Sequence, residues 1–136
     1  MKKIKEIKIG TKFSKSTQVT EEMINGFAKY TGDNNPVHLD EEFASKTMFK
    51  KRIAHGFLVG SFISAILGND FPGNGTIYLS QSMKFRAPVF INDKITVEVE
   101  VIDCPKENRA TLKTTCVNQE NVVVLEGEAF VIPPLS

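Results

Sequence analysis

The sequence has no tryptophan, only two cysteines and two histidines, and a formal net charge of only +1. The near balance of charge argues against a nucleic-acid-binding protein, because such proteins pair many lysines and arginines with phosphates. Two cysteines, Cys104 and Cys116, are too few for a disulfide-stabilised scaffold in a chain of this length. We therefore expect two buried free thiols in a reducing compartment.

Long hydrophobic runs are also missing. The longest apolar stretch, Phe57 to Leu67, falls short of the roughly 20 residues that cross a bilayer. At the start of the chain, Lys5, Glu6 and Lys8 interrupt every candidate for the apolar core of a signal peptide. We therefore expect a cytoplasmic protein without a membrane anchor.

The composition that remains is that of an ordinary globular protein, with 41% hydrophobic and 24% charged residues. The length of 136 residues is about that of one domain. No internal repeat, low-complexity tract or linker divides the sequence. We therefore expect residues 1–136 to form a single domain.

The first half of the chain has helical periodicity. Thr20 is a candidate N-cap for a helix at about 21–30, which opens with two glutamates and places its apolar residues on one face. Asp40 begins a similar pattern, which predicts a brief helix at about 41–48.

A third segment, 57–67, is apolar on all sides and predicts a buried central helix. Along it, small residues recur at every fourth position: Gly56, Gly60, Ser64 and Gly68. This spacing favours close packing against a sheet, with the approach of a ligand as the alternative.

In the second half the hydrophobic period changes to two, which is typical of strands. The expected strands cover 77–85, 95–101, 109–118 and 122–132, and a short extended piece near 13–19 adds a fifth. The sequence therefore predicts an α+β fold, in which a curled antiparallel sheet of about five strands wraps round the central apolar helix.

The segment Thr31 to His38 holds one carboxylate and one imidazole among turn-forming residues. Pro36 disfavours the α conformation at Asn35, so Asp33 and His38 cannot share a continuous helix. In a folded loop the two side chains can converge, hold a water molecule and exchange protons with it. The alternative is structural, with Asp33 capping a turn and His38 an ordinary loop residue.

A second candidate segment leads into the central helix. The backbone amides near Gly56 and Phe57 are expected at the helix N-terminus, where N–H groups lack internal partners and can stabilise an oxyanion. For His55, a hydrogen bond to nearby backbone is favoured over catalysis. Lys50, Lys51 and Arg52 are expected on the solvated surface, where they are also well placed to meet phosphates.

Together these motifs resemble the MaoC-like dehydratase family of hotdog-fold proteins, and in particular its (R)-specific enoyl-CoA hydratases. The resemblance extends from about Val19 to Pro133. It rests on Thr31-Gly32-Asp33-x-Asn35-Pro36-x-His38, on Ala54-His55-Gly56-Phe57-Leu58, and on Pro72-Gly73, Tyr78, Gln81, Phe85, Pro88-Val89 and Asp93. Asn92 stands where the family often has glycine, and asparagine tolerates the left-handed conformation.

The resemblance implies a homodimer of single hotdog domains that adds water reversibly to trans-2-enoyl thioesters of CoA or acyl carrier protein, without metal or organic cofactor. It implies that Asp33 and His38 form the catalytic dyad. It further implies that the amide of Gly56 is the oxyanion donor and that Ser64 lines the substrate pocket. Two other functions stay open, namely a hotdog acyl-CoA thioesterase and a non-catalytic module that binds acyl thioesters.

Overall fold

The computed structural model describes residues 7–106 and 108–135, which form one antiparallel sheet and four helices within those ranges. The sheet has six strands in the order β1-β4-β5-β6-β2, and the short β3 also pairs with β6. In chain order the elements are β1 (Lys12–Gln18), α1 (Glu21–Thr31), α2 (Pro36–Leu39), α3 (Glu41–Ser45), α4 (Gly56–Asn69), β2 (Ile77–Gln81), β3 (Lys84–Phe85), β4 (Lys94–Asp103), β5 (Ala110–Val117) and β6 (Val123–Ile132).

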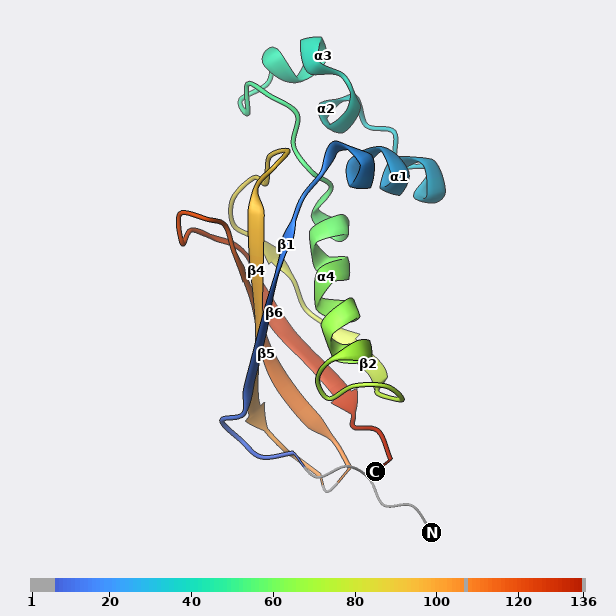
Figure 1. Ribbon diagram of the computed structural model, residues 1–136, viewed down its shortest axis with the longest axis vertical. Helices are drawn as coiled ribbons and strands as arrows, with labels where there is room; N and C mark the ends of the chain where they lie inside the picture. The colour runs from blue at the N-terminus through green and yellow to red at the C-terminus, as the bar shows by residue number, and fades with distance from the viewer. Residues whose placement is uncertain (1–6, 107, 136) are drawn as a thin grey trace.

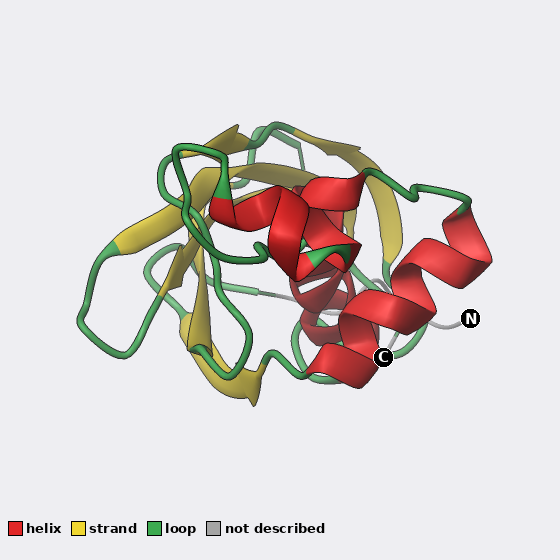
Figure 2. Cartoon of the chain, turned by 90° about the horizontal axis from the view of Figure 1, so that it is seen from above, coloured by secondary structure: helices red, strands yellow, loops and turns green. Residues whose placement is uncertain are grey.

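The sheet curls round α4, as the sequence predicts for the hotdog fold. Figure 1 shows α4 lying along the sheet, with α1, α2 and α3 grouped at the end where α4 begins. Viewed from above, the strands curve round the helices (Figure 2). The α+β class and the curled antiparallel sheet are confirmed.

The core lies between α4 and the sheet. Buried side chains of α4, among them Ile63 and Leu67, belong to one hydrophobic cluster with alternate residues of β4, such as Val97 and Val99. Full burial of one such side chain contributes about 1.5–3 kcal/mol to stability. The apolar residues that alternate along 95–101 in the sequence are therefore the ones that β4 directs into the core.

The expected strand over 77–85 is divided into β2 and β3, which accounts for the sixth strand. The backbone of Ser82 passes so close to Gly127 on β6 that a Cβ at Gly127 would lie 1.8 Å from the Ser82 carbonyl oxygen. The amide of Ser82 bonds to the carbonyl of Glu128 at 2.9 Å, and the strand pairing with β6 stops at Gln81 and resumes at Lys84. Only glycine leaves room for this approach.

The first helix is confirmed, and the next helical segment differs from the expectation. Thr20 Oγ1 caps α1 by accepting a hydrogen bond of 3.1 Å from the amide of Met23. The helix expected at 41–48 ends at Ser45. There Thr47 turns its hydroxyl back onto the carbonyl of Ala44 at 2.7 Å, and the chain leaves the helix.

Other expectations concern single residues. Asn92 adopts a φ of 74°, in the left-handed region that its side chain tolerates. Cys116 is buried and free, whereas Cys104 is free but only partly buried, so the expected burial is wrong for Cys104.

Across the described ranges, we find no helix with the length and apolar character needed to cross a membrane.

Candidate active site

The turn that carries Asp33 is built from local hydrogen bonds. Thr31 Oγ1 accepts from the amide of Asp33 at 3.2 Å, and Asn35 Oδ1 accepts from the amide of Val37 at 3.1 Å. Asn35 is the N-cap of α2, and Pro36 occupies its first turn, where the missing N–H has no cost. This four-residue helix, which the sequence interpretation missed, presents His38 one turn beyond the loop.

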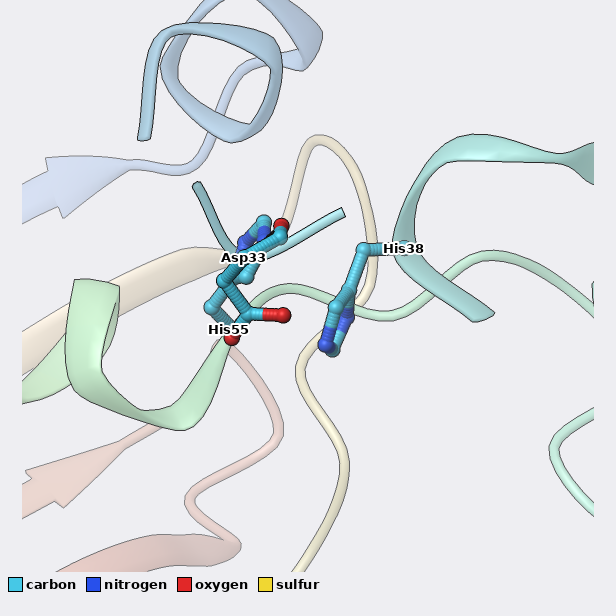
Figure 3. A group of neighbouring side chains, drawn as sticks. All are labelled: Asp33, His38 and His55. Atoms are coloured by element: carbon cyan, nitrogen blue, oxygen red, sulfur yellow. Dashed lines mark hydrogen bonds between the residues drawn. The ribbon is translucent and has the colours of Figure 1, made fainter. Parts of the chain in front are cut away.

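Asp33 and His38 converge, as the folded-loop hypothesis requires. A carboxylate oxygen of Asp33 and a ring nitrogen of each of His38 and His55 lie within 4.8 Å of one another. Figure 3 shows the Asp33 carboxyl group reaching toward the His38 ring, with His55 beside them. Asp33 also caps its turn, through a long contact of 3.4 Å from the Asn35 amide to Oδ1. The Asp33 carboxylate therefore both caps its turn and lies close to the His38 ring.

The hydrogen bond of the His38 ring defines which nitrogen is available. Nδ1 lies 2.8 Å from the carbonyl oxygen of Ile53. A carbonyl oxygen only accepts hydrogen bonds, so Nδ1 carries the hydrogen. In the neutral ring Nε2 then has a free lone pair, as a general base needs.

His55 lies directly behind this pair. Its Nε2 is 3.0 Å from the backbone carbonyl of Asp33, so this nitrogen donates the hydrogen bond. The expectation that His55 bonds to nearby backbone is confirmed. Burial lowers the pKa of His55 below its usual 6.5, the hydrogen bond to Asp33 partly opposes this shift, and the neighbouring His38 adds to it.

Arg52 is not a surface cation, and the suggestion that it meets a phosphate is wrong. It is 8% exposed, and each of its three guanidinium nitrogens donates a hydrogen bond within the protein. Nε donates to the His38 carbonyl at 2.7 Å, and the two terminal nitrogens donate to Glu21 at 2.8 Å and Asn25 at 3.1 Å. Arg52 thus joins α1 to the segment that carries His38.

The N-terminus of α4 supplies free backbone donors. Gly56 is the first residue of α4, and His55 gives no side-chain cap. Within the described ranges the amides of Gly56 and Phe57 have no hydrogen-bond acceptor. A Cβ at Gly56 would lie 2.5 Å from Cε1 of Phe85, so glycine leaves space between the helix end and that ring.

Asp33, His38, His55 and the start of α4 line one cavity of about 510 Å³. Its polar groups include Asp33, His38 and the start of α4 at Gly56, and most of the remaining wall is apolar. The apolar part includes Met48, Phe49, Phe57, Phe85, Val124 and Leu125. A concave, mainly apolar site with a few convergent polar groups is the usual form of a small-molecule site.

Ser64 lies elsewhere. It is exposed on α4, about 12 Å along the helix from Gly56 at 1.5 Å per residue, and is not part of the cavity wall. Its assignment to the substrate pocket stays a prediction. The sequence interpretation missed Met48 and Val124 as wall residues, because their side chains reach the cavity through the tertiary fold alone.

The side chains of Asp33, His38 and His55 are of the types that bind zinc in proteins. The His38 and His55 rings, however, stack with centroids 3.9 Å apart and planes inclined by 29°. Each ring directs its lone pair within its own plane, so two nearly parallel stacked rings do not aim at a common point. The arrangement favours proton transfer over chelation.

Comparison with known proteins places these features in a family context. The sequence model of the MaoC-like domain matches residues 3–124. The 3-hydroxybutyryl-CoA dehydratase of Methylorubrum extorquens is 45% identical over 130 residues, covering 95% of this chain and 82% of that protein. The (R)-specific enoyl-CoA hydratase of Rhodospirillum rubrum is also 45% identical over 130 residues, covering 95% of this chain and 90% of that protein.

Solved structures agree. The (R)-hydratase of A. caviae superposes with a TM-score of 0.91 at 40% identity, covering 94% of this chain and 98% of that one. An unliganded R-hydratase from Pseudomonas aeruginosa superposes with a TM-score of 0.92 at 41% identity, covering 96% of this chain and 84% of that one.

Proposed function

The chain belongs to the family of MaoC-like domains, and from this premise we propose that it is an (R)-specific enoyl-CoA hydratase whose acid–base pair is Asp33 and His38. The observation that carries the proposal is the convergence of these two side chains in a cavity that also holds the free amide of Gly56. The substrate is a trans-2-enoyl thioester, and the product is the (R)-3-hydroxyacyl thioester.

The reaction needs a base for water and a proton donor for carbon. Water loses one proton to the Asp33–His38 pair while its oxygen bonds to the β-carbon of the enoyl group. The α-carbon receives a proton from the same pair, so one molecule of water is added in all. Because the two groups form a coupled pair, they act together as proton acceptor and donor.

The thioester oxygen gains negative charge when water adds to the β-carbon. The amide of Gly56, at the positive end of α4, is the proposed donor to that oxygen. No charged side chain is required there, because unpaired N–H groups at a helix start carry partial positive charge. Protein groups alone thus supply the three functions that the reaction needs.

We also propose that the protein is a homodimer. β2 is an edge strand, and its apolar residues Ile77 and Leu79 remain 52% and 44% exposed in the single chain. An exposed apolar edge strand of this kind favours pairing with another chain. A second copy would cover this edge together with the exposed Phe57 of α4. A cytoplasmic location fits the free thiols of Cys104 and Cys116.

The test is the hydration of crotonyl-CoA by the purified protein, followed by the loss of enoyl absorbance and by chiral analysis of the product. We expect Asp33→Asn and His38→Ala to lower kcat by at least about 100-fold. Lys113→Gln, on the exposed face of β5, is the matched control and should retain full activity. Normal turnover by both dyad variants would contradict the assignment.

The alternatives have different readouts. A thioesterase would release free CoA thiol from saturated acyl-CoA, and the proposal expects none over a range of chain lengths. A binding module would be stabilised by acyl-CoA without turnover. Comparison of CoA and acyl-carrier-protein thioesters of increasing chain length will identify the carrier and the preferred acyl group.

A further inference from the structure

The ring of His55 occupies the junction of three helices. It belongs to the residue at the N-cap position of α4, and this residue is only 2% exposed. One neighbour is Phe27 of α1, whose ring centroid is 4.7 Å away at an interplanar angle of 50°. Another is His38 of α2, at 3.9 Å and 29°. The ring at the start of α4 therefore contacts side chains of both α1 and α2.

His55 contacts both members of the proposed dyad through different surfaces. Its face stacks on the His38 ring, and its edge donates from Nε2 to the Asp33 carbonyl at 3.0 Å. The next residue along the chain is Gly56, whose amide is the proposed oxyanion donor. One buried side chain thus connects the three groups on which the proposed reaction depends.

The bonding of the ring indicates its protonation state. Nε2 carries the hydrogen that it donates to Asp33, whereas Nδ1 is buried and has no hydrogen-bond partner among the described residues. A proton on Nδ1 would bury a cation without an acceptor, which is strongly unfavourable. The neutral form is also favoured because burial lowers the pKa of His55. His55 is therefore a neutral ring with one donor.

We propose that His55 is a positioning residue, which sets the geometry of the Asp33–His38 pair by stacking on one member and bonding to the backbone of the other. This inference rests on the proposed hydratase function. It assigns to His55 no contact with substrate.

The physical reason is the sensitivity of proton transfer to distance and orientation. A displacement of about 1 Å in a catalytic group can lower a rate by on the order of 100-fold. The hydrogen bond from Nδ1 to the Ile53 carbonyl leaves the His38 ring free to tilt about the direction of that bond, and stacking on the His55 ring limits this tilt. In addition, when His38 gains a proton during turnover, the adjacent neutral ring offers it a π face, and such a contact stabilises a cation.

Two variants separate the two contacts. His55→Gln keeps a donor for the Asp33 carbonyl but removes the stacked ring. His55→Phe keeps a ring against His38 and Phe27 but removes the donor. We expect each variant to lower kcat by about 10- to 100-fold, while KM for crotonyl-CoA changes by less than about threefold, because the dyad is displaced and the substrate site remains. The dissociation constant of butyryl-CoA, measured by calorimetry, should likewise stay within about threefold.

A loss of stability must be distinguished from a loss of positioning. Val101→Ala removes buried volume from β4 at a residue that does not line the cavity, and it serves as the destabilised control. All variants are assayed at a temperature at which circular dichroism shows them folded. We expect Val101→Ala to keep the wild-type kcat there.

The outcomes separate this inference from the function it rests on. If the wild-type protein does not hydrate crotonyl-CoA, the proposed function fails. If the wild type is active and depends on Asp33 and His38, but both His55 variants retain kcat within about twofold, the positioning role alone is overturned. A rise in KM with an unchanged kcat would also overturn it, since that result describes a residue of the binding surface.

Discussion

The Nε of Arg52 donates a hydrogen bond of 2.7 Å to the backbone carbonyl of His38. Arg52 does not line the cavity, and its remaining guanidinium nitrogens bond to Glu21 and Asn25 of α1. Arg52 therefore stabilises the position of His38 without offering a charge to substrate. Its planar set of donors makes these bonds in fixed directions, which a lysine cannot reproduce.

Replacement of Arg52 by methionine should destabilise the fold. Arg52→Met leaves the part-buried His38 carbonyl without its donor and also removes the bonds to Glu21 and Asn25, which together should cost on the order of 1–3 kcal/mol. Urea denaturation measures this change. Lys51→Met is the matched control: the Lys51 ammonium lies 4.5 Å from the centre of the Phe90 ring, an exposed contact of about 0.5–1 kcal/mol. An equal or smaller loss for Arg52→Met would contradict the positioning role of Arg52.

An added methyl group at Gly56 should impair catalysis. The Cβ of Gly56→Ala would lie 2.5 Å from Cε1 of the Phe85 ring, so either that ring or the end of α4 must shift within the cavity. Loss of one oxyanion donor typically costs about 100- to 1,000-fold in kcat, and we expect a fall of at least about tenfold. Steady-state kinetics with crotonyl-CoA measure it.

Gly26→Ala provides the control for that variant. Gly26 lies within α1, and a Cβ there has nothing within 4 Å. Alanine should therefore stabilise the helix by about 0.5–1 kcal/mol and leave kcat unchanged. An unaltered kcat in Gly56→Ala would contradict the expectation that the reaction depends on the geometry around the amide of Gly56.

The free energy of unfolding should fall as the solution is acidified below the usual pKa of histidine. His55 has its pKa lowered by burial in the folded protein, whereas the unfolded chain has the ordinary value of 6.5. Above that pH both states are neutral and the contribution is fully present. Below it the unfolded chain binds a proton that the folded protein does not, so folding loses stability.

Urea denaturation across pH 5–8 tests this dependence. The titratable groups that face the ring are His38 and Asp33, and both remain in His55→Gln. We expect the variant to lose part of the slope of unfolding free energy against pH that the wild type shows. The same slope in both proteins would show that His55 titrates normally in the fold.

A charge on the edge strand should separate the proposed dimer. Leu79→Lys places an ammonium group on β2, where a partner chain would have to bury it. Sedimentation velocity should give a dimer for the wild type and a monomer for this variant. Val122→Lys changes another exposed apolar residue, in the hairpin between β5 and β6, and should remain dimeric. A monomeric wild type at micromolar concentration would refute the proposal.

Features encoded by neighbouring residues could be predicted from the sequence. Thr20 caps the first helix through an amide three residues away, and the inward residues of β4 alternate at the spacing of a strand. The bend at Asn35 and Pro36 already implied that Asp33 and His38 are carried on separate segments. In each case the determining interaction lies within a few residues of chain.

Features created by distant contacts could not be predicted. Arg52 reads as one more cation beside Lys50 and Lys51, and only the fold brings it to Glu21, which is 31 positions away. The break between β2 and β3 depends on Gly127, which lies on a different strand. The stack of His55 on His38 likewise follows from how two helices meet, and no spacing in the sequence specifies a ring orientation.

In the segment between residues 31 and 37, the side chains of Thr31 and Asn35 accept hydrogen bonds from backbone amides, while His55 and Ile53 donate to two of its carbonyls from outside. The opposite wall of the cavity, by contrast, is formed by side chains such as Phe85 and Val124 from other parts of the chain. Neither Phe85 nor Val124 takes part in these bonds, so replacements in that wall change the space available to a substrate tail while the turn keeps its hydrogen bonds. Directed evolution toward bulkier or longer substrates should therefore begin at Phe85 and Val124, where new selectivity can be gained while the type of reaction is preserved.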